Sequence, residues 1–260
     1  MENILLFAIE LLFFDRVISF CISSIVPKLC QRIFKKKFGD LSQKKKYEVT
    51  LNASNLLVTS ILFCVSVYEV FFDQNIRKPW GFSYVAYWNL SLAVEYSCAV
   101  ALLRLKWKLK FYPSQCVHFV AVGVFGLVAM ANHGPLYAAN LRIVTILPVP
   151  FLSLRNILRE LDMKSTDSYL VADKMIVFVS LLFRILYLPR HYISFYYRHE
   201  LYSNPLLLYY VTFWWWLIGS LTFDLLNIYW FVKCAKGYFN VAGIFSSNKV
   251  KHESNSAKVR

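Results

Sequence analysis

Residues 114–154 read SQCVHFVAVGVFGLVAMANHGPLYAANLRIVTILPVPFLSL, and this stretch decides how often the chain crosses a membrane. It is apolar almost throughout, but a helix needs only about 20 residues to span a hydrocarbon core about 30 Å thick. The stretch is therefore too long for one crossing. It is interrupted by Asn132-His133-Gly134-Pro135, and a Gly-Pro pair is a strong helix breaker. We therefore predict two helices, at 114–132 and 136–154, joined by a tight hairpin.

Other long apolar stretches lie on both sides of this hairpin, at 3–26, 48–72, 84–103, 170–192 and 205–232. The 260-residue chain is 58% hydrophobic and 17% charged, whereas an average soluble domain is about 25% charged. Within a bilayer each segment must satisfy its own backbone hydrogen bonds, so these solid apolar runs indicate helices and not the alternating strands of a membrane barrel. The sequence predicts an all-α integral membrane protein with seven transmembrane helices.

Positive charge alternates from one connection to the next. Most of the 29 Lys and Arg residues follow the first, third, fifth and seventh predicted helices, within 28–46, 104–110, 155–164 and 233–260. The intervening connections hold only Arg77, Lys78 and Arg198. The positive-inside rule then places the N-terminus outside or in a lumen and the C-terminus in the cytosol.

The net charge of +14 comes from these connections, which flank membrane helices, so nucleic acid is not the expected partner. Anionic cytosolic lipid is the nearer partner, and the basic loop offers Lys35, Lys36, Lys37, Lys44, Lys45 and Lys46. The alternative is that these lysines only determine topology. Trp107, Tyr112, Trp230 and Tyr238 are expected to mark the cytosolic interface.

None of the six cysteines lies in a predicted outer loop, so no disulfide framework is expected. Cys30 and Cys234 lie next to the membrane on the cytosolic side, where thiols can be acylated. The alternative is that both are plain structural thiols.

Several ionisable side chains fall inside the predicted helices, where such groups usually face the bundle interior. These are Glu10, Glu69, Glu95, His118, Arg142, Arg184 and Asp224, with Asn140 and Asn227 beside them. Asp224 and Asn227 are three residues apart and share a helical face. Arg184 needs an acidic partner, and Asp224 or Glu95 is the natural choice. The set forms either structural ion pairs or a lipid-binding site, whose candidate residues are Glu95, His118, Asn140, Arg142, Arg184, Asp224 and Asn227.

The sequence offers no metal or cofactor site. The five histidines are not clustered, which argues against the His-box of a di-iron desaturase. There is no glycine-rich phosphate loop and no Gly-x-Ser-x-Gly elbow. An isolated histidine inside a membrane, such as His118, is more often a packing residue than a base or ligand.

Three stretches in the second half resemble the TLC-domain family, which includes ceramide synthases and TRAM-type translocation proteins. They are Asn140-Leu-Arg142 with Pro150-Phe151 and Leu154-Arg155, then Phe183-Arg184-Ile185-Leu186 with Pro189, then Asp224-Leu-Leu-Asn227-Ile-Tyr-Trp230-Phe-Val-Lys233-Cys-Ala-Lys236-Gly237. The resemblance implies a barrel-like bundle of helices 2 to 7 around a cavity where family enzymes handle acyl chains. It divides the chain into an N-terminal helix (1–27), a basic cytosolic loop (28–46), a TLC domain (47–238) and a tail (239–260) that we expect to be disordered.

The chain departs from the family's enzymes at the catalytic helix. Acyl-transferring members carry adjacent histidines followed by acidic residues, whereas this chain has Cys116-Val117-His118 and no Asp or Glu before Ala131. Losing a general base commonly removes about 10²–10⁴-fold of rate. We therefore expect little catalysis, and no catalytic residues, from this chain.

The favoured interpretation is a protein that binds lipid or a membrane partner and influences membrane lipid composition or trafficking. Its partners would be a sphingolipid or phospholipid, or another membrane protein. The alternative is an acyl-CoA-dependent, ceramide synthase-like acyltransferase that uses His118 with Glu95. A seven-helix receptor is a third hypothesis, which rests on fold analogy alone. The resemblance favours the endoplasmic reticulum, with the Golgi or plasma membrane as alternatives.

Overall fold

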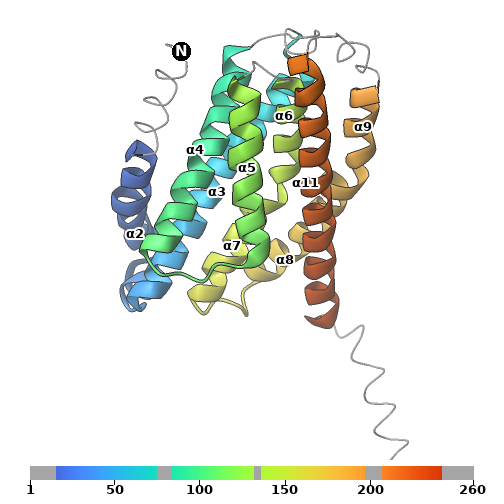
Figure 1. The fold of residues 1–260 in the computed structure, drawn as a ribbon. Helices are drawn as coiled ribbons and strands as arrows, with labels where there is room; N and C mark the ends of the chain where they lie inside the picture. The colour runs from blue at the N-terminus through green and yellow to red at the C-terminus, as the bar shows by residue number, and fades with distance from the viewer. Residues whose placement is uncertain (1–15, 75–82, 132–135, 197–206, 242–260) are drawn as a thin grey trace, which may run out of the picture.

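The structure is a computed structural model, and the residues that it describes are 16–74, 83–131, 136–196 and 207–241. Every regular element in these ranges is a helix, which confirms the predicted all-α class (Figure 1). The predicted hairpin break at 132–135, Glu10 and nearly all of the predicted tail lie outside the described residues.

The elements follow one another in chain order, and three of the long helical runs change helix type along their length. They are η1 (Cys21–Ile25), α2 (Val26–Gly39), α3 (Gln43–Phe71), α4 (Tyr84–Lys106), α5 (Pro113–Ala131), α6 (Leu136–Ile143), η2 (Val144–Ile146), α7 (Pro148–Glu160), α8 (Asp167–Ser180), η3 (Leu181–Leu186), α9 (Leu188–Tyr196) and α11 (Leu207–Val241). η1 and η3 are π-helical and η2 is a 3₁₀ turn.

Four helical runs in the described residues are long and apolar enough to cross a bilayer. They are Arg16–Gly39, Gln43–Phe71, Tyr84–Lys106 and Leu136–Glu160, and a shorter apolar helix covers Pro113–Val124. These runs make the chain an integral membrane protein. The number of seven crossings stays a prediction.

The surface is apolar and much of the interior is polar, as a lipid environment requires. On α11, for example, Leu225 is 69% exposed while Asp224 is only 6% exposed. On α3, Ile61 is 55% exposed while Glu69 is fully buried. This distribution is the reverse of that in a soluble protein, where large apolar residues are mostly inside. It supports a bundle whose outer face meets lipid.

The segment predicted as a basic cytosolic loop, 28–46, is mostly helical. α2 spans Val26–Gly39 with a kink at Lys35, where φ is 45°, and the turn at 40–42 connects it to α3 at Gln43. Val26 and Cys30 before the kink and Phe38 after it are buried and pack with residues of α3 and α7. Because Cys30 is 2% exposed, its thiol is not available for acylation in this fold.

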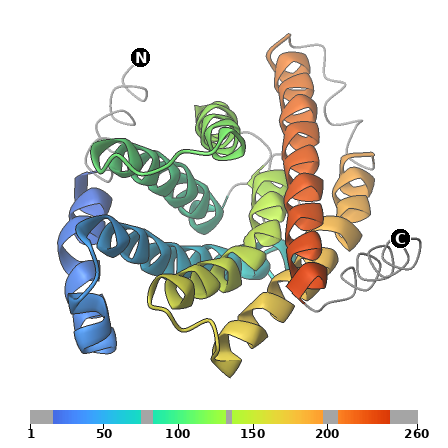
Figure 2. The same cartoon turned by 90° about the horizontal axis from the view of Figure 1, so that it is seen from below.

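The helices pack side by side along most of their length (Figure 1). α3 contacts α2, α4, α6 and α7, while α5 lies between α4 and α11. α8 contacts α7 on one side and α11 on the other, as the view from below shows (Figure 2). The last helix, α11, thereby contacts both α5 and α8.

A buried polar network joins α3, α4 and α6. The Asn89 side-chain amide donates to Ser66 Oγ (2.7 Å) and to Asn140 Oδ1 (2.8 Å). The Asn140 amide in turn donates to the Ala86 carbonyl (3.2 Å) on α4. Asn140 is fully buried, so these bonds have no water to replace them. The network fixes the relative positions of three helices.

Replacing Asn140 by alanine should lower the thermal stability of the protein in detergent. The substitution leaves buried donors and acceptors on Asn89 and the α4 backbone with fewer partners, at a cost of about 1–2 kcal/mol. Ser60→Ala is the control, because the Ser60 hydroxyl donates only to the Leu56 carbonyl of its own helix. Equal melting temperatures for the two variants would contradict the role of the network.

Candidate functional site

One face of α11 carries polar side chains into the bundle. Ser220, Asp224 and Asn227 are 2%, 6% and 6% exposed, and their spacing of three and four residues puts them on one helical face. Trp230 and Cys234 continue the same spacing. The opposite face of α11 exposes residues such as Leu221 and Leu225. This burial agrees with the prediction that Asp224 and Asn227 share one face of the helix.

Asp224 is held by two side chains from two other elements. Arg142 of α6 binds both of its carboxylate oxygens, with a distance of 3.0 Å from the second guanidinium nitrogen to Oδ2. The Tyr192 hydroxyl of α9 also donates to Asp224 Oδ2. The side chains of Arg142 and Asp224 are 10% and 8% exposed. This three-residue cluster ties α6, α9 and α11 together.

Arg184 therefore does not pair with Asp224, which corrects our expectation. Nor does Glu95 pair with it: Glu95 accepts a hydrogen bond from Ser91 on its own helix (2.9 Å). Within the described residues the Arg184 guanidinium makes no ion pair and no hydrogen bond, and its Nε atom is buried without a partner. Arg184 is 6% exposed. Its cationic group contacts the Trp230 ring, with Cζ 5.3 Å from the ring centre.

Arg184 lies in a stretch of unusual helix type. This stretch is η3, where the backbone forms a π-helix between α8 and α9. Such widened turns are rare and occur frequently at functional sites. A charged side chain near the middle of a transmembrane helix costs about 2.5–3.5 kcal/mol on insertion scales. A buried arginine with no carboxylate partner therefore needs another source of compensation.

His118 of α5 lies against the same tryptophan. Its ring centre is 5.3 Å from that of Trp230 and 5.8 Å from that of Phe223, with both pairs in edge-on geometry. Its Nδ1 atom is buried and has no hydrogen-bond partner. His118 forms no hydrogen bond with Glu95 in the described part of the chain, so the acid–base pair expected of an acyltransferase is not assembled.

The sequence-predicted residues thus separate into two groups. Asn140, Arg142 and Asp224 have protein partners in networks that join helices, although Arg142 Nε itself has none. His118 and Arg184 each have a buried nitrogen atom without a partner, and both contact Trp230. Trp230, which is expected at the cytosolic interface, is half-buried and contacts both His118 and Arg184.

Two further ion pairs were missed because their partners are far apart in sequence. Arg155 of α7 binds Asp173 of α8 at 2.8 Å, and Arg104 of α4 binds Glu48 of α3 at 3.3 Å. Asp173 is 8% exposed and Arg104 is also 8% exposed, so both pairs are largely buried. They give each of these two arginines a carboxylate partner on a neighbouring helix.

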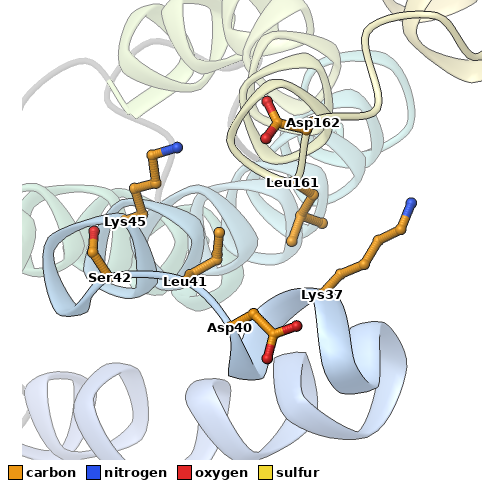
Figure 3. A pocket seen from close by; sticks show the side chains of 7 residues that line it. All are labelled: Lys37, Asp40, Leu41, Ser42, Lys45, Leu161 and Asp162. Atoms are coloured by element: carbon orange, nitrogen blue, oxygen red, sulfur yellow. The ribbon is translucent and has the colours of Figure 1, made fainter.

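A surface cleft of about 380 Å³ lies where the α2–α3 turn approaches the end of α7. Figure 3 shows Lys37 and Lys45 lining it beside Asp40 and Asp162. The two positive charges are matched by two negative ones, so the cleft itself does not select an anion. The expected attraction for anionic lipid depends instead on exposed lysines outside it, such as Lys36 and Lys44.

Comparisons with known proteins bear on both the fold and the site. A family model described as TLC domain matches residues 49–236. The chain is 24% identical over 232 residues to the human protein named TLC domain-containing protein 4, which covers 85% of this chain and 86% of that protein. No solved structure matches it. The matched segment contains every helix that contributes to the interior cluster of His118, Arg184 and Trp230.

Proposed function

Because this chain belongs to the TLC-domain family, we propose that its multi-pass bundle binds a lipid in its interior and does not catalyse acyl transfer. The observation that carries the proposal is the pair of buried, unpartnered nitrogen groups on Arg184 and His118. Arg142 and Arg155 also have a buried Nε without a partner, but each binds a carboxylate through another nitrogen atom, whereas Arg184 binds none among the described residues. A bound lipid gives Arg184 and His118 a partner and would link the protein to membrane lipid composition or trafficking.

The packing order supports a barrel of six helices. Successive contacts run from α3 to α4, from α4 to α5, from α5 to α11, from α11 to α8, from α8 to α7, and from α7 back to α3. This sequence of neighbours closes on itself. In this proposal α6 precedes α7 in one span, α9 follows α8 in another, and the N-terminal run Arg16–Gly39 is a seventh crossing outside the barrel.

We propose that the C-terminus is cytosolic and that the protein resides in the endoplasmic reticulum, with the exposed lysines near the α2–α3 turn against anionic lipid. The bound lipid would be a sphingolipid or a phospholipid. A membrane-protein partner is the competing proposal, and an empty interior would favour it.

Mass spectrometry of lipids that copurify with the protein in mild detergent tests lipid binding directly. We expect one lipid class to be retained at near-stoichiometric amounts after washing, well above its share in the surrounding membrane. Retention of lipids only in proportion to their membrane abundance would contradict the proposal.

Replacing His118 by glutamine separates the proposal from acyltransfer. Glutamine can donate a hydrogen bond but cannot carry a proton, so a general base would lose about 10²–10⁴-fold in rate. We expect membranes that contain the wild type or the variant to transfer labelled acyl groups from acyl-CoA equally, at background level. Acyl transfer that depends on His118 would establish the enzyme instead.

A further inference from the structure

Arg184 differs from the other inward-facing arginines in having no carboxylate partner. Arg104 has Glu48, Arg142 has Asp224 and Arg155 has Asp173, each within ion-pair distance. Arg184 is 6% exposed and no described acidic residue pairs with it. Its contact with the Trp230 ring accommodates a cation but supplies no negative charge. One buried positive charge is thus left unmatched among the described residues.

Two nitrogen groups from different helices converge on the same ring. Arg184 Cζ and the centre of the His118 ring each lie 5.3 Å from the centre of the Trp230 ring. Arg184 Nε and His118 Nδ1 are both buried without partners. An anion placed between them can accept hydrogen bonds from the guanidinium and from the imidazole, whereas a neutral hydroxyl would leave the charge unmatched.

The anion must arrive attached to an apolar chain. Arg184 lies well inside the helical run that extends from Asp167 to Tyr196, away from both of its ends. The outer faces of that run carry exposed apolar residues such as Phe178 and Leu186. A freely hydrated ion would lose its water on reaching this depth, but an amphipathic lipid loses less because its chain is already in the membrane.

We propose that the bundle selects a lipid with an anionic polar group, a carboxylate or a phosphate, which binds Arg184 and His118 beside Trp230. This inference rests on the proposed lipid binding and names the chemistry that the site selects. Arg184 is the main determinant because its charge is permanent, and His118 adds a hydrogen bond. Trp230 positions the guanidinium through its ring face.

The test measures binding of photoreactive alkynyl lipids to the purified, delipidated full-length protein. The probes are a fatty acid, its methyl ester and a lysophosphatidate with the same chain, and inorganic phosphate serves as the chain-free anion. We expect the acid or the lysophosphatidate to label the wild type at least about tenfold more strongly than the ester. Whichever is stronger identifies the anion as carboxylate or phosphate.

Arg184→Gln should reduce labelling by the anionic probes about tenfold and leave labelling by the ester unchanged. Arg184→Lys, which keeps the charge, should restore part of it. Arg190→Gln is the matched control, because Arg190 lies on the next helix, is exposed, and contacts the rings of Phe71 and Tyr187. Arg184→Gln should also raise the melting temperature of the delipidated protein, because it removes an unmatched buried charge. A merely structural arginine would give the opposite shift.

Equal labelling by acid and ester would overturn the inference while leaving lipid binding intact. So would undiminished labelling of Arg184→Gln by the anionic probes. Inorganic phosphate should not raise the melting temperature as much as the lipids do. If it did, the anion that binds Arg184 would not need to come from a lipid, and the inference would be overturned. No specific labelling by any probe would overturn the inference and the proposed function together.

Discussion

Replacing Asp224 by leucine should destabilise the protein by about 3–5 kcal/mol. The substitution leaves the Arg142 guanidinium buried in the bundle without its carboxylate, and it removes the acceptor of the Tyr192 hydroxyl. Breaking a buried pair from one side costs far more than the pair itself contributes, because the remaining charge is uncompensated. Thermal unfolding in detergent, followed by loss of monodisperse protein, measures the effect.

The double variant Arg142→Met/Asp224→Leu provides the decisive comparison. Replacing both charges with apolar residues of similar volume removes the uncompensated ion, so we expect it to recover most of the lost stability. Tyr192→Phe removes one hydroxyl donor and should cost only about 1 kcal/mol. A double variant as unstable as Asp224→Leu alone would show that shape at this position, and not charge, determines the stability.

The class of fold was predictable because a membrane imposes length and composition on every crossing. The apolar runs at 48–72 and 84–103 correspond closely to α3 and α4. The helical structure of the basic segment after the first helix was not predicted. Its many lysines drew attention away from Val26, Cys30 and Phe38, which pack α2 with residues of α3 and α7 on both sides of the kink at Lys35.

The candidate site was predictable in its members but not in its pairings. An ionisable residue in an apolar run can be recognised from sequence, and Arg142, Arg184 and Asp224 were all recognised in this way. Which acidic side chain forms an ion pair with which arginine depends on the positions of helices that are distant in sequence. Asp224 is 82 residues from Arg142, and only the placement of these helices in the fold decides between Arg142 and Arg184.

The packing distinguishes polar groups that have protein partners from those that have none, which sequence does not. Inside a low-dielectric bundle a satisfied polar group holds helices together, as Asn140 and Asp224 do. A buried polar group left without a partner lowers stability. Arg184 and His118 are the described pair that meets this criterion around one ring.

Close approach of α4 and α5 brings His118 to its place, and Gly126 makes that approach possible. A Cβ atom added at Gly126 would lie 2.2 Å from Val94 Cγ2, closer than real Cβ contacts. Val94 is fully buried on α4, so its side chain has little room to move. Gly123, one turn earlier on α5, has nothing within 4 Å of the same position. The two glycines therefore form a matched pair on one helix.

Gly126→Leu should lower stability by about 3 kcal/mol relative to Gly123→Leu, because overpacking a closed contact forces the two helices apart. Both variants gain the same helix propensity over glycine, about 1 kcal/mol, so that term cancels in the comparison. Adding Val94→Ala to Gly126→Leu should recover part of the loss by opening space on α4. Separation of α5 from its neighbours would also displace His118 from Trp230, so Gly126→Leu should retain less lipid after purification. Equal melting temperatures for the Gly126 and Gly123 variants would mean that α4 and α5 do not approach as closely as the packing at Val94 requires.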